Sequence, residues 1–189
     1  QAEPGGLIHE HTKVVSLALA SNVLGTINPV QRIAQWAHQV GAVVVVDASQ
    51  AVPQMPVDVT ELGVDLLAFT GHKMLGPTGI GILWGRYDLL DDLPPFLGGG
   101  EMIEVVRMTG STYAKPPHRF EAGPPPIAQL TALAVAADYL DEVGMAAIAQ
   151  REHRLAALML EGLGSVPGVH ILGPTDATAR TGTVSFTVD

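Results

Sequence analysis

Apolar residues in the first half of the chain fall into short continuous runs, separated by polar and glycine-rich segments. Each run has the length of a strand, and the second is almost entirely valine, as in a strand buried on both faces of a sheet. The runs are Lys13–Leu19, Ala42–Asp47, Val64–Thr70 and Gly79–Gly85. A helical pattern separates the first two runs, and a short helix or turn over residues 59–63 precedes the third. This alternation predicts an α/β fold with a mainly parallel sheet covered by helices.

The helix between the first two runs has recognisable ends. Asn28 suits the N-cap position, Pro29 suits the first helical position, and Gln31 completes a capping box. Gly41 is expected to end the helix. Residues that recur at helical spacing predict its buried face, namely Ile33, Ala37 and Val40.

The pattern changes after Gly85. Residues 87–104 combine an acidic turn, paired prolines and three glycines, so we expect an irregular region there. Helices are predicted over Ile127–Leu140 and Met145–Leu163, and one face of the second is predicted to hold Leu155, Leu158, Met159 and Gly162. Alternating strands are expected over residues 168–172 and 181–188. We therefore expect part of a large domain over residues 1–144 and the start of a small α/β C-terminal domain over residues 145–189.

Composition narrows the class of protein. The 189 residues are 47% hydrophobic and 15% charged, with a mean hydropathy of +0.29. This balance favours a well-buried core or a surface that a partner covers. The formal net charge of −9 argues against nucleic acid as a partner, because phosphate groups repel an acidic surface.

The sequence shows no sign of export or membrane insertion. No apolar run approaches the roughly 20 residues that a membrane helix needs. The first ten residues lack the basic and apolar regions of a signal peptide. The chain contains no cysteine, which excludes disulfides and thiolate metal sites. We therefore expect a cytoplasmic protein that does not bind a membrane.

Polar residues gather where the predicted strands end. Asp47 and Thr70 end two strands, and Lys73 follows Thr70 closely. Gln50 lies about one turn after Asp47, and Asn22 follows the first strand. Ligands of open parallel sheets bind outside the carboxyl ends of the strands. The sequence therefore predicts that these residues meet at one edge and form a binding site.

Two interpretations of the acid and the lysine are open. Asp47 and Lys73 can form a simple salt bridge. Alternatively, Lys73 can hold pyridoxal 5'-phosphate (PLP) as a Schiff base while Asp47 keeps the ring nitrogen protonated. Such a lysine must be shielded from water, and Thr70 or His72 can donate to the phosphate or the ring. The glycines after Lys73 can let the backbone approach the cofactor.

Other common site motifs do not fit. Residues 76–81 lack the dinucleotide-binding spacing and lead into a strand, where that motif needs a helix. The sequence contains neither a phosphate-binding P-loop motif nor a nucleophile-elbow serine motif. His9 and His11 lie two residues apart near the start of the chain, a setting that argues against a metal, so no metal site is predicted.

Four stretches of the sequence resemble one known family. They are SNVLGTINPV (residues 21–30), VVVDASQAVPQMPVDV (44–59), FTGHKMLGPTGIGIL (69–83) and RFEAG (119–123). In this order they resemble the SUF-type cysteine desulfurases of the class V aminotransferase family, and the likeness runs from about Val14 to the end. The resemblance implies the three-layer fold of fold-type I PLP enzymes, working as a homodimer.

The resemblance also implies roles for individual residues. Lys73 would bind PLP covalently, and Asp47 would pair with the pyridinium nitrogen. Gln50 would hydrogen-bond the ring hydroxyl, Thr70 and His72 would hold the phosphate, and Asn22 would contact the cofactor or the substrate carboxylate. The implied reaction converts L-cysteine to L-alanine and passes the sulfur to an enzyme cysteine, then to a SUF acceptor protein for iron–sulfur cluster assembly.

The chain departs from the family pattern at several positions. It has no cysteine to carry the persulfide, Pro124 stands where members usually have threonine, and Leu19 where many have histidine. We therefore expect an incomplete desulfurase. Two alternatives stay open: another class V lyase, such as a selenocysteine lyase or an epimerase-like member, and an inactive chain that only dimerises or binds a partner.

Overall fold

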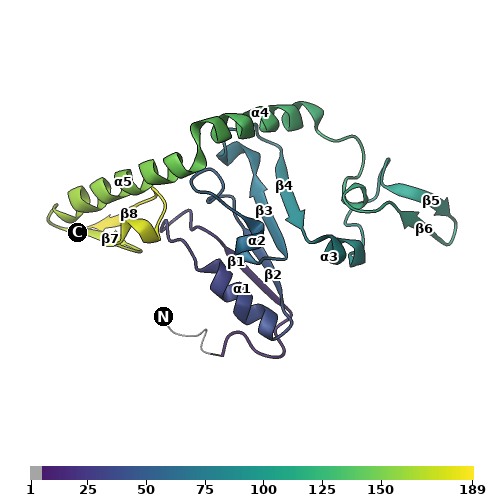
Figure 1. Cartoon of the computed structure of the whole chain (residues 1–189), viewed down its shortest axis with the longest axis horizontal. Coiled ribbons are helices and arrows are strands. Elements are labelled where there is room, and N and C mark those ends of the chain that lie inside the picture. The colour runs from purple at the N-terminus through teal and green to yellow at the C-terminus, as the bar shows by residue number, and fades with distance from the viewer. Residues whose placement is uncertain (1–5) are drawn as a thin grey trace.

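A four-stranded sheet forms the centre of the molecule (Figure 1). The computed structural model describes residues 6–189, so the first five residues of the predicted 1–144 domain lie outside the described residues. The strands stand in the order β1-β2-β3-β4, with bounds Val14–Ala18, Val43–Asp47, Leu66–Thr70 and Gly81–Gly85. Neighbours among β1, β2 and β3 are parallel. The predicted α/β class with a mainly parallel sheet is confirmed.

Strand β4 is the exception, because it runs antiparallel to β3. A parallel return needs a crossover of about a dozen residues or more. The connection from Thr70 to Gly81 holds only the short 3₁₀ turn η1 (Gly71–Lys73). The chain therefore folds straight back, and the sheet is mixed.

The main core lies between β2 and helix α1 (Val30–Gln39). Val44 and Val46 of β2 are fully buried, and each contributes about 1.5–3 kcal/mol by leaving water. Ala34 and Ala37 of α1 pack in the same cluster. Ala37 confirms one of the three positions predicted for the buried face, whereas Ile33 and Val40 are only half-buried.

The start of α1 differs from the predicted capping box. Pro29 is the N-cap, and no side chain caps this end. The amide of Asn28 instead donates to the carbonyl of Ala18 at 2.8 Å, which ties the helix start to the end of β1. Gly41 has a φ of 74° and follows the helix, as predicted. The short helix predicted near residues 59–63 is also confirmed, as α2 (Val59–Leu62).

The region predicted to be irregular contains regular structure. Residues 87–104 include helix α3 (Tyr87–Asp92) and the start of a hairpin of β5 (Ile103–Arg107) and β6 (Gly110–Tyr113). Asp91 of α3 pairs with Lys115 at 2.7 Å and with Arg119 at 3.2 Å. These partners lie more than 20 residues away, so local sequence could not reveal them.

Two long helices follow, α4 (Ile127–Val143) across the top of the view in Figure 1 and α5 (Met145–Gly164), which descends from it towards the left. The hairpin of β7 (Val169–Leu172) and β8 (Ser185–Val188) lies beside α5. Short 3₁₀ turns η2 (His118–Phe120) and η3 (Ala177–Ala179) complete the elements. The division into domains at residue 144 stays a prediction.

The face predicted for α5 is largely exposed to solvent. Ala156 and Leu160 are the buried residues of this helix, whereas the predicted Leu155, Leu158 and Met159 are exposed. The helix packs chiefly on β7 and η3. Helical spacing alone identifies several possible faces, and the tertiary contact selects one of them.

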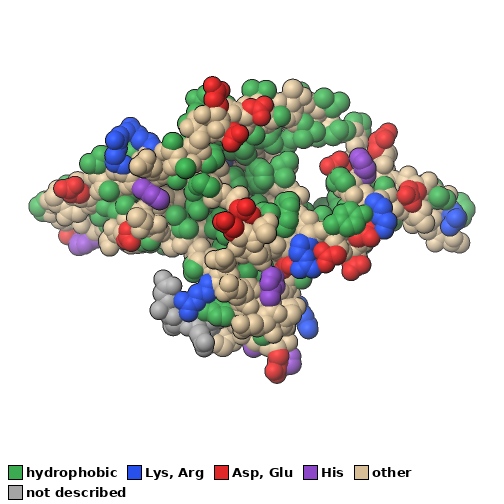
Figure 2. Space-filling model, viewed as in Figure 1, with side chains coloured by type: hydrophobic (Ala, Val, Ile, Leu, Met, Phe, Trp, Pro, Cys, Tyr) green, Lys and Arg blue, Asp and Glu red, His purple; other side chains and the backbone are tan. Residues whose placement is uncertain are grey.

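Hydrophobic side chains line a hollow between the sheet and α4 (Figure 2). The hollow measures about 430 Å³, and its walls include Leu67, Phe69 and Trp84 from the sheet with Leu140 from α4. Within residues 6–189, no helix combines the length and the apolar character that crossing a membrane requires.

Candidate active site

The strand register places the predicted polar residues at one edge of the sheet. Asp47 is the last residue of β2, opposite Ala18 of β1 and Ala68 of β3. Thr70 is the last residue of β3, and Asn22 lies in the loop after β1. This is the edge at which the sequence predicts a site. The roles of these residues stay predictions.

Asp47 presents its carboxylate to solvent. The side chain is exposed, and its Oδ1 accepts the backbone N–H of Ser49 at 2.8 Å. That bond fixes the carboxylate against the turn that follows β2. The same turn carries the half-buried Gln50, whose carbonyl accepts the side-chain amide of Gln54 at 2.8 Å.

Thr70 and His72 are joined directly. The Thr70 hydroxyl and His72 Nδ1 share a hydrogen bond of 2.7 Å. The bond holds the exposed imidazole over the end of β3 and leaves Nε2 to meet a ligand. A hydroxyl and an imidazole held this way are suited to binding a phosphate group.

Lys73 ends the turn η1, directly after β3. The shielding from water that a Schiff-base lysine requires stays a prediction, and among the described residues the Lys73 side chain is exposed. The physical reason for the exposure is its position, because η1 lies where the sheet edge meets solvent.

A pocket of about 530 Å³ brings Lys73 and Gln50 together. Helices α4 and α5 form the opposite wall of this pocket, with Tyr139 and Val143 from α4 and Ile148 from α5. Asp47, Asn22, Thr70 and His72 are not among its lining residues. Sequence reasoning missed this wall, because apolar residues at helical spacing usually indicate core.

Glycines let helix α4 approach the turn that carries Lys73. A Cβ on Gly71 would lie 3.2 Å from Leu133 Cδ1, and one on Gly76 would lie 2.8 Å from the same atom. These two glycines therefore make room for α4. Close packing against Leu133 is therefore one reason for glycine at positions 71 and 76. The sequence suggests a second reason, which is close approach of the backbone to a cofactor.

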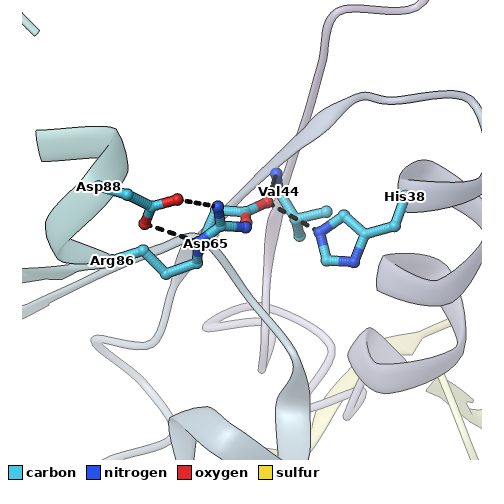
Figure 3. A network of polar contacts seen from close by, with 5 residues as sticks. All are labelled: His38, Val44, Asp65, Arg86 and Asp88. Carbon is cyan, nitrogen blue, oxygen red and sulfur yellow. Dashed lines mark hydrogen bonds and ion pairs between the residues drawn. The ribbon is translucent and has the colours of Figure 1, made fainter. Parts of the chain in front are cut away.

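A charged network lies at the opposite end of the strands (Figure 3). Asp65 is 3% exposed and accepts Val44 N–H at 2.7 Å, His38 Nε2 at 2.9 Å and the Arg86 guanidinium at 2.7 Å. Burial raises the pKa of Asp65, but the hydrogen bonds from His38 and Val44 and the charge of Arg86 lower it overall. Sequence reasoning missed this network, which joins three distant segments.

Metal binding has no support among the described residues. Within residues 6–189, no group of three or more histidine, cysteine, aspartate and glutamate side chains could hold a metal ion. Leu19, where many family members have histidine, is buried in the core. Pro124 is exposed.

Comparison with known proteins supports the resemblance. The sequence model of the aminotransferase class-V family matches residues 3–189. A probable cysteine desulfurase from Streptomyces coelicolor is 58% identical over 182 residues, which cover 96% of this chain and 44% of that protein. The chain therefore spans less than half the length of this relative.

Solved structures agree with this result. A cysteine desulfurase from Thermococcus onnurineus NA1 is 40% identical, with a TM-score of 0.89 over 93% of this chain and 44% of that one. The cystine C–S lyase C-DES is 29% identical, with a TM-score of 0.80 over 94% of this chain and 48% of that one. A C-DES mutant was solved with glycine covalently linked to its PLP cofactor. The described residues thus match part of the structure of fold-type I cysteine desulfurases, and the chain belongs to the class V aminotransferase family.

Proposed function

We propose that the complete protein is a PLP-dependent cysteine desulfurase that converts L-cysteine to L-alanine and passes on the sulfur. The observation that carries this proposal is the set of side chains at one sheet edge. It combines an amine, a carboxylate, an amide, a hydroxyl and an imidazole, on Lys73, Asp47, Gln50, Thr70 and His72. This donor set fits the aldehyde, ring nitrogen, ring hydroxyl and phosphate of PLP.

Each side chain has a distinct task in this proposal. The Lys73 amine binds the cofactor covalently, and the Asp47 carboxylate holds a proton on the ring nitrogen. Gln50 donates to the ring hydroxyl, while Thr70 and His72 hold the phosphate. Asn22 contacts the cofactor or the substrate carboxylate. When bound, the cofactor supplies an electron sink for the substrate carbon.

Sulfur transfer needs a thiol that these 189 residues do not contain. In the proposal, the persulfide-carrying cysteine therefore comes from outside this sequence. The complete protein would form the three-layer fold-type I domain, act as a cytoplasmic homodimer and pass sulfur to an acceptor protein of the SUF system.

A C–S lyase of the same family is the second candidate. Such a lyase would use Lys73 and Asp47 in the same way, but it needs no persulfide-carrying residue. Similarity to C-DES is consistent with this alternative. The products separate the two, since the desulfurase forms alanine whereas β-elimination forms pyruvate and ammonia.

The first experiment records the visible absorption of the complete protein with added PLP, followed by borohydride reduction and peptide mapping. We expect a new absorption band and a label fixed on Lys73. Lys73→Ala should abolish both, whereas Lys13→Ala, at another exposed lysine, should keep both. A folded protein that gains no label at Lys73 would overturn the proposal and favour the inactive alternative.

A further inference from the structure

Arg180 is the largest fully buried side chain among the described residues. Its guanidinium donates to three backbone carbonyls, those of Leu24 at 3.0 Å, Thr183 at 2.6 Å and Pro174. Leu24 belongs to the loop between β1 and α1, more than 150 residues earlier in the sequence. One side chain therefore joins the two ends of the described chain.

Further bonds join the same two segments. We call residues 21–27 the Asn22 loop and residues 179–185 the Arg180 segment. Thr181 N–H donates to Gly25 O at 2.8 Å and Ile27 N–H to Ala179 O at 3.0 Å, and these two bonds form an isolated antiparallel bridge between Thr26 and Arg180. In addition, Ser185 Oγ donates to Val23 O. The loop is thus bound along most of its length by residues from the C-terminal end.

The Asn22 loop packs closely against the C-terminal part of the chain at two glycines. Gly25 has a φ of 72°, and a Cβ there would lie 2.4 Å from Thr183 O. On the other side, a Cβ on Gly173 would lie 2.9 Å from Leu24 O. Because the obstructing atoms are backbone, neither position accepts a side chain without moving the loop.

Arg180 recognises the shape of the loop rather than a charge. No carboxylate within residues 6–189 pairs with it, and burial lowers the pKa of its guanidinium. Its planar fork matches carbonyl groups in one arrangement only, whereas a lysine ammonium is a single point donor. The bond to the loop therefore forms only when the carbonyl of Leu24 is in place.

The loop also holds its own first turn. Ser21 Oγ accepts the N–H groups of Val23 at 3.2 Å and Leu24 at 3.1 Å, and Ser21 N–H donates to Thr26 O at 2.9 Å. Asn22 lies inside this turn. Its backbone position therefore depends on where Arg180 and its segment hold Val23 to Ile27.

We propose that Arg180 is a positioning residue of the predicted cofactor site, which sets the conformation of the Asn22 loop from the β7–β8 side of the molecule. The inference rests on the proposed function, because it gives Asn22 a role toward cofactor or substrate. It adds that the C-terminal segment acts on that site through a loop, without touching the cofactor.

The first test needs no cofactor. Hydrogen–deuterium exchange of the complete apo protein is compared for the unaltered sequence, Arg180→Lys and Leu160→Ala. Leu160 is buried in α5 and serves as a control for loss of packing in the same region. We expect amides of residues 21–27 to exchange about tenfold faster in Arg180→Lys, because the charged hydrogen bond to the Leu24 carbonyl is lost. Leu160→Ala should leave these amides unchanged, and equal exchange in all three proteins would overturn the inference.

The second test couples the arginine to Asn22. The variant Asn22→Ala first shows whether Asn22 affects the dissociation constant for PLP or the KM for L-cysteine. Arg180→Lys should raise the same constant about tenfold, but should add no further change in the Asn22→Ala background. Fully additive effects would contradict a role through the loop.

The experiments distinguish failure of the proposed function from failure of the inference about Arg180. A missing label at Lys73 in the unaltered protein counts against the function, whereas a normal label with unchanged loop exchange in Arg180→Lys counts against the inference alone. If Arg180→Lys does not fold, Ser185→Ala removes a milder contact with Val23 and decides the matter by the same exchange measurement. Faster exchange of the loop supports the proposal, and unchanged exchange overturns it.

Discussion

At the scale of single residues, Asp65 shows how a buried charge is made tolerable. An isolated carboxylate is costly to remove from water, but Asp65 accepts hydrogen bonds from α1, β2 and the residue after β4. His38 and Arg86 keep about half of their side-chain surface in solvent. The network therefore joins three segments of the chain, and Asp65 at its centre is the member shielded from water.

We predict that Asp65→Asn lowers the free energy of unfolding by about 2 kcal/mol at neutral pH. The amide cannot accept all three donors, and Val44 N–H is buried with no access to water. Urea denaturation measures the change. Asp88→Asn is the matched control, because Asp88 also pairs with Arg86 but is exposed, and its effect should be far smaller.

The effect of Asp65 also depends on pH. Its pKa in the folded protein lies below the ordinary value of 3.8, so the ionised form stabilises the fold above that pH. The difference between the unaltered protein and Asp65→Asn should stay constant from neutral pH to about pH 4 and shrink below it. A difference that instead grows on acidification would contradict the depressed pKa.

At the scale of elements, the turn η1 and helix α4 depend on each other. Gly71 and Gly76 face Leu133, and Leu133 packs with Met74 and Leu140 in a second buried cluster. The lysine-bearing turn is thus held from behind by a helix some 60 residues later. Its geometry follows from this packing as well as from the turn sequence.

We predict that Gly76→Ala destabilises the fold by about 1–3 kcal/mol and reduces the PLP label at Lys73. The new Cβ would lie 2.9 Å from the Gly71 carbonyl oxygen, a backbone atom that cannot move alone. Thermal unfolding and the borohydride label measure the two effects.

Gly162→Ala in α5 is the matched control for this change. A Cβ at Gly162 would have no neighbouring atom within 4 Å, and alanine is more favourable than glycine in a helix interior. This substitution should raise stability by about 0.5–1 kcal/mol and leave the label intact. A loss of stability from Gly162→Ala, or none from Gly76→Ala, would show that the packing argument is wrong.

At the scale of the whole molecule, the region from residue 96 to residue 113, which we call the arm, extends away from the sheet (Figure 1). It carries apolar side chains in solvent, including Phe96 at 91% exposure and Met108 at 103%. Exposed apolar groups gathered on one projection favour a surface that another molecule covers. In the proposed homodimer, we expect a second copy to cover the arm.

We predict that the complete protein is a dimer and that Phe96→Ser combined with Met108→Glu shifts it to monomer. The substitutions remove apolar contact area and place a charge where the partner would lie. Light scattering after size-exclusion chromatography measures the mass. Leu158→Ser, at another exposed apolar residue on α5, should leave the dimer intact, and a double variant that remains dimeric would place the interface elsewhere.

The sequence by itself determined the parallel strands, the helices between them and the edge where polar residues gather. These features follow from local runs and from strand direction, because the carboxyl ends of parallel strands share one edge. Asp47 and Thr70 lie there because each is the last residue of a parallel strand. The sequence also identified the family, because the family's motifs are short continuous stretches around Asn22, Asp47 and Lys73.

Only the tertiary structure decided how distant segments meet. The reversal of β4, the bond from Asn28 to Ala18, the buried face of α5 and the environments of Asp65 and Arg180 all depend on partners far along the chain. An aspartate before a strand, or an arginine in a loop, has the same local sequence whether it is buried or exposed. Burial and hydrogen bonding are properties of the assembled fold, and for this reason pattern and spacing could not supply them.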